Sequence, residues 1–451
     1  MNILVLSGSP KGENSITLQT VLYLEKLHPE HRFTYLHVGR TYRSLERDFS
    51  PAAEALKDAE LLLFAYPVYT FLVPSQLHRF LELMKASGVE LRGKYATQIT
   101  TSKHFYDVTA HRFIKDNCQD LGLRFINGLS ADMEDLLHEK GRAQAEAFFD
   151  YVLHCMERGL YETPPAPLPP AGKKPVTPAR ETEGKTGRAV IVADLTQEDG
   201  QLRAMVERFR AVSPLRTELV NLREFPFKGG CLSCFHCAAE GKCVYTDGFD
   251  DFLRNNIQTA DAIVLAFTIR DHSMGSLFKT YDDRQFCNGH RSVTMGKPFG
   301  YLISGAYSRE DNLQMVVEAR AEAGGNFLAG VACDETDPDR EIDALADRLA
   351  YAVAHHYVQS ANFYGVGGMK IFRDLIWQMQ GLMREDHRFY KAHGQYDFPQ
   401  KRRGTMLAMY LVGAMAANPS FQKKMGNKMT EGMLLPYKKA LMQAARRAKK
   451  K

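Results

Sequence analysis

Four cysteines stand close together in the segment CLSCFHCAAEGKC, at residues 231–243. Cys231, Cys234, Cys237 and Cys243 have the spacing C-x2-C-x2-C-x5-C. Three thiolates at intervals of three residues let a short loop wrap one face of a compact cluster, and [4Fe–4S] loops use similarly dense spacing. Structural zinc usually takes ligands from two pairs separated by a wide gap, which is missing here. We rank a [4Fe–4S] cluster first, zinc second and plain thiols last.

A polar loop follows the first apolar segment of the chain. NILVLSG (2–8) predicts a buried strand, and SGSPKGENSIT then leads into a predicted helix. Free backbone N–H groups and the positive end of a helix suit a phosphate at such a position. The loop has neither a Walker ending nor a G-x-G-x-x-G fingerprint. The predicted phosphate contacts are Ser9, Lys11, Asn14, Ser15 and Thr17.

Two later strand ends extend this candidate site. AELLLFAYP (59–67) and YATQITTS (95–102) predict buried strands. With the strand order 2-1-3-4-5, their carboxyl ends emerge beside the polar loop, where open α/β sheets bind ligands. A flat ring could rest there; ordinary strand-end or core roles are the alternative. The expected contacts are Pro67, Val68, Tyr69 and Thr70 on one side, and Thr100, Thr101 and Ser102 on the other.

The elements that position these residues occur twice. Short apolar runs alternate with amphipathic helices before and after a proline-rich segment, which predicts parallel sheets covered on both faces. The fold class is therefore α/β, with two doubly wound parallel-sheet domains in tandem and a helical extension. The predicted domains are residues 1–160, a linker at 161–187, a second domain at 188–358 that holds the cysteines, and a basic extension at 359–451.

Composition and apolar run length indicate the cellular compartment that we expect for the chain. Its 451 residues are 45% hydrophobic and 25% charged, the start lacks the pattern of a secretory signal, and the longest apolar run (404–417) is short for a membrane span. We expect a reducing cytoplasm, where clustered thiols bind metal more often than they form disulfides. Cys118, Cys155, Cys287 and Cys333 are expected to be ordinary buried thiols.

The basic residues gather near the carboxyl end. Residues 362–451 carry a net charge of +13, whereas the whole chain carries +5. A solvated helical face is the expected reading, and contact with an acidic membrane surface is the alternative. The runs KRR (401–403) and RRAKKK (446–451) lack interleaved aromatic residues, so nucleic-acid binding is not expected.

The first half resembles the flavodoxin-like NAD(P)H-dependent FMN reductases over roughly residues 1–155. The resemblance lies in the loop SGSPKGENS and in Pro67-Val68-Tyr69. It implies that the loop residues bind the phosphate of FMN and that residues 67–70 lie along its ring. Family members usually carry tryptophan or tyrosine with glycine after this proline, whereas this chain has VYTFLVP.

The second half resembles the iron-sulfur flavoproteins in its cysteine segment and in GKCVYTDGFDDF, ADAIVLAF and LFKTYDDRQF. This resemblance implies a [4Fe–4S] cluster held by the four cysteines. Glu198 and Asp199 stand where a phosphate would lie, and Thr268-Ile269-Arg270 replaces Pro67-Val68-Tyr69. Because two carboxylates repel a phosphate, we predict no FMN in the second half.

The two resemblances together imply an FMN- and [4Fe–4S]-containing oxidoreductase that moves electrons between NAD(P)H, flavin, cluster and an acceptor such as a quinone or nitro compound. They also imply that the two halves form an internal pseudo-dimer, while a homodimer stays open. No nicotinamide motif is visible, so NAD(P)H follows from the resemblance alone. The alternatives are an electron carrier that serves a protein partner and a zinc-stabilised binding protein without redox chemistry.

Overall fold

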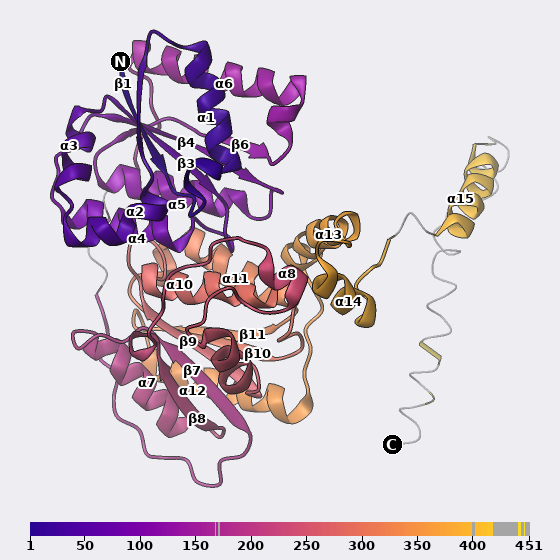
Figure 1. Ribbon diagram of the computed structural model, residues 1–451. Coiled ribbons are helices and arrows are strands. Elements are labelled where there is room, and N and C mark those ends of the chain that lie inside the picture. Colours follow the sequence, from indigo (N-terminus) through magenta and orange to yellow (C-terminus); the bar gives the residue numbers. More distant parts are fainter. Residues whose placement is uncertain (167, 170–171, 399–401, 418–440, 443–445, 447–451) are drawn as a thin grey trace. The chain divides into compact units, whose positions relative to one another are not determined.

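The computed structural model describes residues 1–166, 168–169, 172–398, 402–417, 441–442 and 446. Residues 1–392 form one compact unit and residues 393–451 a second. Within the first unit, Figure 1 shows two α/β lobes, which we call the first lobe (residues 1–158) and the second lobe (residues 188–355).

The first lobe is a parallel sheet in the order β2-β1-β3-β4-β5, with β6 also paired to β4. This is the predicted order 2-1-3-4-5. The strands are β1 (Asn2–Ser7), β2 (Arg32–Leu36), β3 (Leu61–Pro67), β4 (Tyr95–Ser102), β5 (Arg124–Phe125) and β6 (Leu129–Asp132). The helices are α1 (Ile16–Leu27), α2 (Val38–Arg47), α3 (Ser50–Asp58), α4 (Ser75–Ala86), α5 (Asp107–Asp120) and α6 (Glu139–Arg158).

The second lobe repeats this plan with the parallel order β8-β7-β9-β10-β11. Its strands are β7 (Arg188–Ala193), β8 (Arg216–Asn221), β9 (Ala262–Thr268), β10 (Pro298–Ser304) and β11 (Phe327–Cys333). Its helices are α7 (Gly200–Val212), α8 (His236–Glu240), α9 (Phe249–Phe252), α10 (Ser276–Arg284), α11 (Asp311–Gly324) and α12 (Pro338–His355). The predicted class, two doubly wound domains in tandem, is confirmed.

Alternate strand residues bury opposite faces of each sheet, because successive side chains of a strand point to opposite sides. Ile3 and Val5 of β1 pack with α1 and α6 in one apolar cluster. Leu4 and Leu6 face the other way, into a cluster that continues through α4 and α5 to the strands of the second lobe, such as Leu265. The two lobes therefore share one core, and fully burying each such leucine contributes about 1.5 to 3 kcal/mol.

Helices α4 and α10 cap each other across the lobe boundary. The first N–H groups of a helix have no partner inside it and need an outside acceptor. The Ser75 N–H donates to Asp283 Oδ2 at 2.8 Å. In return, the Ser276 N–H donates to Glu82 Oε1 at 2.7 Å. Ser75 and Ser276 are the first residues of α4 and α10. Each helix carries, seven residues after its own first serine, the carboxylate that caps the other helix, so the contact is reciprocal.

The later part of the segment between the lobes lies against the second lobe. Its described residues from 159 to 187 contain no helix or strand. The backbone N–H of Lys174 donates to Asp334 O at 2.7 Å, and that of Thr182 donates to Ala211 O at 2.9 Å. The segment is thus bound to the second lobe at Lys174 and Thr182, whereas at its start the Glu162 N–H donates to Phe125 O of the first lobe at 2.8 Å.

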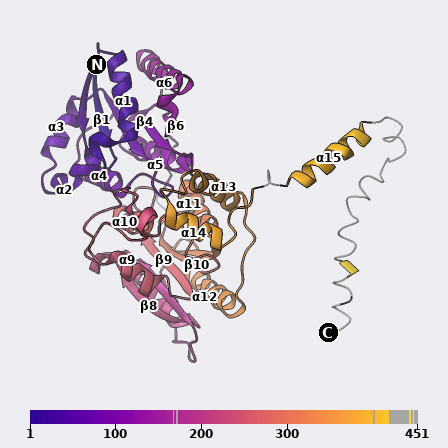
Figure 2. The ribbon, with the colours of Figure 1, turned by 45° about the vertical axis from the view of Figure 1, so that its right-hand side comes forward.

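The predicted extension at 359–451 is divided in the structure. Helices α13 (Phe363–Gln378) and α14 (Arg384–Ala392) belong to the unit of the two lobes, whereas α15 (Arg403–Ala416) belongs to the second unit. Figure 2 shows α13 and α14 beside the lobes. Ile376 of α13 is fully buried. The basic run 446–451 lies outside the described residues except for Arg446.

Candidate functional site

The loop between β1 and α1 is tight and partly buried. Gly12 has φ +57°, and a side chain there would also collide with Arg40. Helix α2 packs closely on the loop, since a Cβ added at Gly39 would lie 2.3 Å from the carbonyl oxygen of Ser9. Ser9 and Ser15 are 1% and 3% exposed. The predicted phosphate loop is therefore held in shape by its surroundings.

Strand alternation separates the predicted residues at the end of β4. The hydroxyl oxygens of Thr17 and Thr101 lie 2.6 Å apart, which joins this strand end to the polar loop. Thr100 points to the opposite face, where its hydroxyl lies 2.8 Å from Nε2 of His111. Thr101 thus belongs with the loop, and Thr100 does not.

The turn after β3 has an unusual backbone. Thr70 and Phe71 have φ values of +42° and +70°, a region that side chains other than glycine rarely adopt. The turn is closed by hydrogen bonds between the backbones of Tyr69 and Leu72, at 2.8 and 3.0 Å. Such strain persists where the surroundings enforce it, often at functional sites. Tyr69 is 5% exposed, and its buried hydroxyl has no hydrogen-bond partner among the described residues.

The cysteine segment of the second lobe lies against the first lobe. The side chain of Gln76, on α4, donates to the carbonyl oxygen of Cys231 at 3.2 Å. A Cβ added at Gly230 would lie 2.2 Å from the Ser75 hydroxyl, so the two chains approach closely there. The ammonium of Lys11, in the polar loop, lies 5.5 Å from the ring centre of Phe235. The cysteines are thereby brought beside the predicted phosphate loop.

Arg284 anchors both flanks of the cysteine segment. Its guanidinium donates to the carbonyl oxygen of Gly229 at 3.0 Å, before the first cysteine. It also donates to both carboxylate oxygens of Asp247, after the last cysteine, at 2.8 and 2.7 Å. The ring of Tyr245 lies 4.3 Å from the guanidinium carbon. Burial opposes ionisation of Asp247, but these bonds and the charge of Arg284 hold its pKa at about 2.

One cavity of about 330 Å³ joins the two sets of predicted residues. That volume lies in the range of ligand pockets. Asn14 and Thr100 do not line it; Asn14 is exposed in the first turn after Lys11. The predicted residues that do line it are Ser9, Lys11, Ser15, Thr17, Pro67, Val68, Tyr69, Thr70, Thr101, Ser102, Cys231, Cys234, Cys237 and Cys243.

Other lining residues had no signal in the sequence. Cys287, expected to be an ordinary buried thiol, is 2% exposed and lines the cavity with the four cysteines. Phe372 of α13 also lines it, with its ring centre 4.2 Å from that of Phe105 and 4.9 Å from that of His290. Phe372 lies in an apolar helical pattern, which is the same for a residue of the core and for a residue of a cavity wall.

The sulfurs of the segment occupy a mixed environment. Burial raises the pKa of the Cys231 thiol, and burial together with nearby Asp386 raises the pKa of Cys237 to about 11. Cys234 is exposed. Tetrahedral zinc with bonds of about 2.3 Å would hold sulfurs about 3.8 Å apart. Among the described residues, no three thiol sulfurs lie within 4.8 Å of one another, so the sulfurs are not arranged with the spacing of a tetrahedral zinc site.

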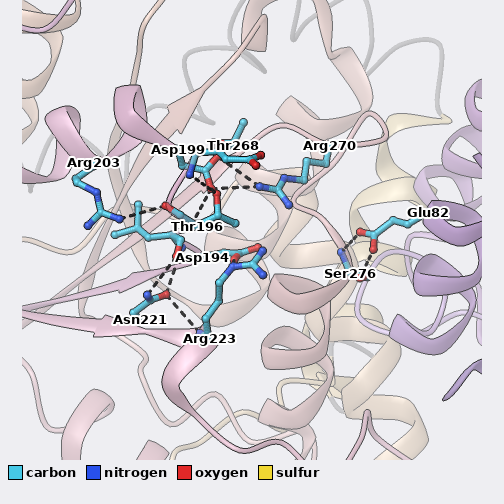
Figure 3. A network of polar contacts seen from close by, with 12 residues as sticks. Glu82, Asp194, Thr196, Asp199, Arg203, Asn221, Arg223, Thr268, Arg270 and Ser276 are labelled. Carbon is cyan, nitrogen blue, oxygen red and sulfur yellow. Dashed lines mark hydrogen bonds and ion pairs between the residues drawn. The ribbon is translucent and has the colours of Figure 1, made fainter. Parts of the chain in front are cut away.

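The corresponding place in the second lobe is filled by side chains of the chain itself. Figure 3 shows Asp199 at its centre, accepting hydrogen bonds from the Thr196 backbone at 2.8 Å and the Thr268 hydroxyl at 3.0 Å. Arg270 lies 3.2 Å from the same carboxylate. A carboxylate therefore takes the donors that a bound phosphate would use. That the second lobe holds no FMN stays a prediction.

Comparison with known proteins agrees with this architecture. Residues 1–117 match a family described as Flavodoxin_2, with a flavodoxin-like fold. Residues 1–117 have a flavodoxin-like fold. The predicted resemblance to flavodoxin-like flavoproteins is confirmed: an "Iron-sulfur flavoprotein" of Archaeoglobus fulgidus is 25% identical over 175 residues, which cover 36% of this chain and 78% of that protein.

Two solved structures are also similar in part. An NAD(P)H:quinone oxidoreductase from Methanothermobacter marburgensis has 15% identity and a TM-score of 0.30, and covers 39% of this chain and 100% of its own. General stress protein 14 from Treponema denticola, in complex with FMN, has 13% identity and a TM-score of 0.29. The match covers 34% of this chain and 98% of that protein.

In the part of the chain that the structure describes, no helix combines the length and the apolar character needed to cross a bilayer.

Proposed function

We propose that this protein is an NAD(P)H-dependent oxidoreductase that binds FMN in the first lobe and a [4Fe–4S] cluster at the cysteine segment. Its acceptor is a small molecule such as a quinone or nitro compound. The matching flavodoxin-like family and the iron-sulfur flavoprotein relative support this proposal. The proposed donor, NAD(P)H, follows from the resemblance to the FMN reductases.

One observation carries the proposal. The predicted phosphate loop, the strained turn after β3 and all four clustered cysteines line the same cavity, although they come from different lobes. FMN accepts a hydride and an iron-sulfur cluster passes single electrons, so a site that holds both can couple two-electron and one-electron reactions. A shared cavity would place the two groups close enough for this exchange.

Different residues would bind the phosphate, the flavin ring and the cluster. Ser9 and Ser15 are buried at the start of α1, where hydroxyls and backbone N–H groups suit a phosphate dianion. The buried Tyr69 lines the cavity, and its hydroxyl would be available to the polar edge of a flavin ring. The N–H of Ser233 already donates to the Cys231 sulfur at 3.4 Å, as amides do to cluster ligands.

The direct test is cofactor analysis of protein purified without oxygen. We expect one FMN, about four iron and about four acid-labile sulfide per chain, because a [4Fe–4S] cluster has that composition. Added NAD(P)H should bleach the flavin bands, and a quinone should restore them. Stoichiometric zinc in place of iron, or a colourless protein that resists reconstitution, would contradict the proposal.

Ser9→Ala should weaken FMN retention about 10- to 150-fold and leave the iron content unchanged, since a hydrogen bond to a charged group contributes about 1.5 to 3 kcal/mol. Equilibrium dialysis of FMN measures the effect. Asn14→Ala is the matched control, because Asn14 belongs to the same loop but does not line the cavity. Equal loss of FMN in both variants would contradict the placement of the phosphate.

Cys234→Ala should remove iron and spare the bound FMN. Metal analysis and flavin absorption of the same sample measure both. Cys333→Ala is the control, since Cys333 does not line the cavity. Loss of both cofactors from a folded Cys234→Ala variant would mean that the two sites are not separable.

An electron carrier that serves a protein partner is the second candidate function. It is favoured by the surface around the exposed Cys234, where Leu232 and Val244 are 37% and 49% exposed. A carrier would take up electrons from NAD(P)H or a reductant but would not turn over with small acceptors. Steady-state oxidation of NAD(P)H with quinones distinguishes the two.

A further inference from the structure

A polar cluster lies between the lobes, away from the cavity. His78 and Glu82 stand one turn apart on α4, and Asp271 lies in the turn that follows β9 of the second lobe. One nitrogen or oxygen ligand atom from each of the three side chains lies within 4.8 Å of the other two. None of the three lines the cavity.

His78 is an unpartnered imidazole in this cluster. Its side chain is fully buried, and neither ring nitrogen has a hydrogen-bond partner among the described residues. Leaving a buried polar group unsatisfied costs about 1 to 3 kcal/mol. Burial also lowers the pKa of His78, which favours the neutral ring that ligates metals. The imidazole therefore faces two carboxylates without the partner that its burial demands.

The two carboxylates are already oriented by other groups. Glu82 accepts the Ser276 N–H at 2.7 Å and the Ser276 hydroxyl at 2.6 Å, a contact across the lobes that Figure 3 shows. Arg79 donates to the same carboxylate at 2.8 Å. The ammonium of Lys85 lies 3.0 Å from Asp271. Hydrogen bonds of this kind hold metal-ligating carboxylates in place.

The surrounding ion-pair network carries an excess of negative charge. Two sets of ion pairs lie there: Arg79 joins α2 to Glu82 of α4, and Lys85 and His272 join α4 and α5 to the turn at 271–272 and to Glu310. Five carboxylates face three basic groups there, so a bound cation would reduce the imbalance. The carboxylates are Glu46, Glu82, Asp120, Asp271 and Glu310, and the basic groups are Arg79, Lys85 and His272.

The second lobe holds a cation at the equivalent place. Lys279 is the fourth residue of α10, as His78 is of α4. Its ammonium is fully buried, donates to the carbonyl oxygen of Tyr69 at 2.8 Å and pairs with Asp283. The first lobe has a histidine where this ammonium would be. A cationic side chain thus occupies this helix position in the second lobe, whereas in the first lobe the position holds an imidazole without a hydrogen-bond partner among the described residues.

We propose that His78, Glu82 and Asp271 bind one divalent transition-metal ion that links the two lobes. Imidazole and carboxylate ligands together suit manganese, iron(II) and zinc. Because the ligands come from both lobes, the ion would stabilise their contact. This site is separate from the cavity and does not depend on the proposed redox function.

Manganese(II) is the probe, because thiolates bind it poorly and the cysteine segment then does not compete. Mn²⁺ is titrated into the cofactor-containing protein, and the electron paramagnetic resonance of free Mn²⁺ measures binding. We expect one bound ion per chain. His78→Leu removes a ligand and places an apolar side chain of similar size beside Phe113, which the His78 ring contacts. This variant should bind Mn²⁺ at least tenfold more weakly.

Asp271→Asn is the second variant and should also weaken binding at least tenfold; circular dichroism shows whether each variant is folded. The matched control is His31→Gln, in the surface group His28, Glu30 and His31, which has a similar ligand set. That variant should bind as the wild type does. The proposal is overturned if the wild type binds no Mn²⁺, if His31→Gln alone loses it, or if either folded interface variant binds as tightly as the wild type.

Discussion

The ion pair of Asp247 and Arg284 should be one of the most sensitive points of the structure. Both side chains are 1% exposed, and the guanidinium closes the cysteine segment through Gly229 as well. Asp247→Asn leaves a buried guanidinium without its counter-charge, which typically destabilises a protein by about 3 to 5 kcal/mol. The pKa of Asp247 agrees in order of magnitude, since a depression from 3.8 to about 2 corresponds to about 2 kcal/mol for all the groups that favour the carboxylate.

Urea unfolding of the wild type and of Asp247→Asn measures the difference, and iron analysis of the same samples reports on the cysteine segment. We expect the variant to lose at least about 2 kcal/mol of unfolding free energy and to retain less iron. Glu181→Gln is the control, because its ion pair with Lys185 is surface-exposed, with Glu181 80% exposed. Exposed pairs contribute about 0 to 1 kcal/mol. Equal stability of the two variants, or unchanged iron in Asp247→Asn, would refute the anchoring role.

Two further changes test other parts of the structure. Burial lowers the pKa of His111 from 6.5 to about 4, so folding stability should fall as the pH drops from 6.5 through 4, because the unfolded chain takes up the proton first; His111→Gln, followed by urea unfolding at several pH values, should flatten this dependence. Asp199→Ala should lower the unfolding free energy by about 1 to 3 kcal/mol, because it leaves the part-buried donors of Thr196 and Thr268 without their acceptor.

Each of these has an outcome that would contradict it. If His111→Gln loses stability between pH 6.5 and 4 as steeply as the wild type, another group is responsible for the acid dependence. If Asp199→Ala unfolds at the same urea concentration as the wild type, the network of Figure 3 does not stabilise the second lobe.

Local patterns were enough for the elements and for the order of the first sheet. Apolar runs such as residues 2–8 and 95–102 can be buried on both faces only in a covered parallel sheet, so their class followed from composition. The spacing of Cys231, Cys234 and Cys237 is likewise local, since a short loop brings such residues together wherever it lies. The polar loop after β1 was predictable because a strand that leads into a helix always exposes the same backbone N–H groups.

Tertiary structure alone decided what shares the cavity. The cysteine segment meets the polar loop because α4 and α10 cap each other across the lobes, a contact between residues about two hundred positions apart. The same packing brings Cys287 and Phe372 into the wall. The sequence by itself determines which helix, strand or loop each segment can form. Which segments contact one another depends on which apolar faces are buried together, and a local pattern does not specify the partner of a face.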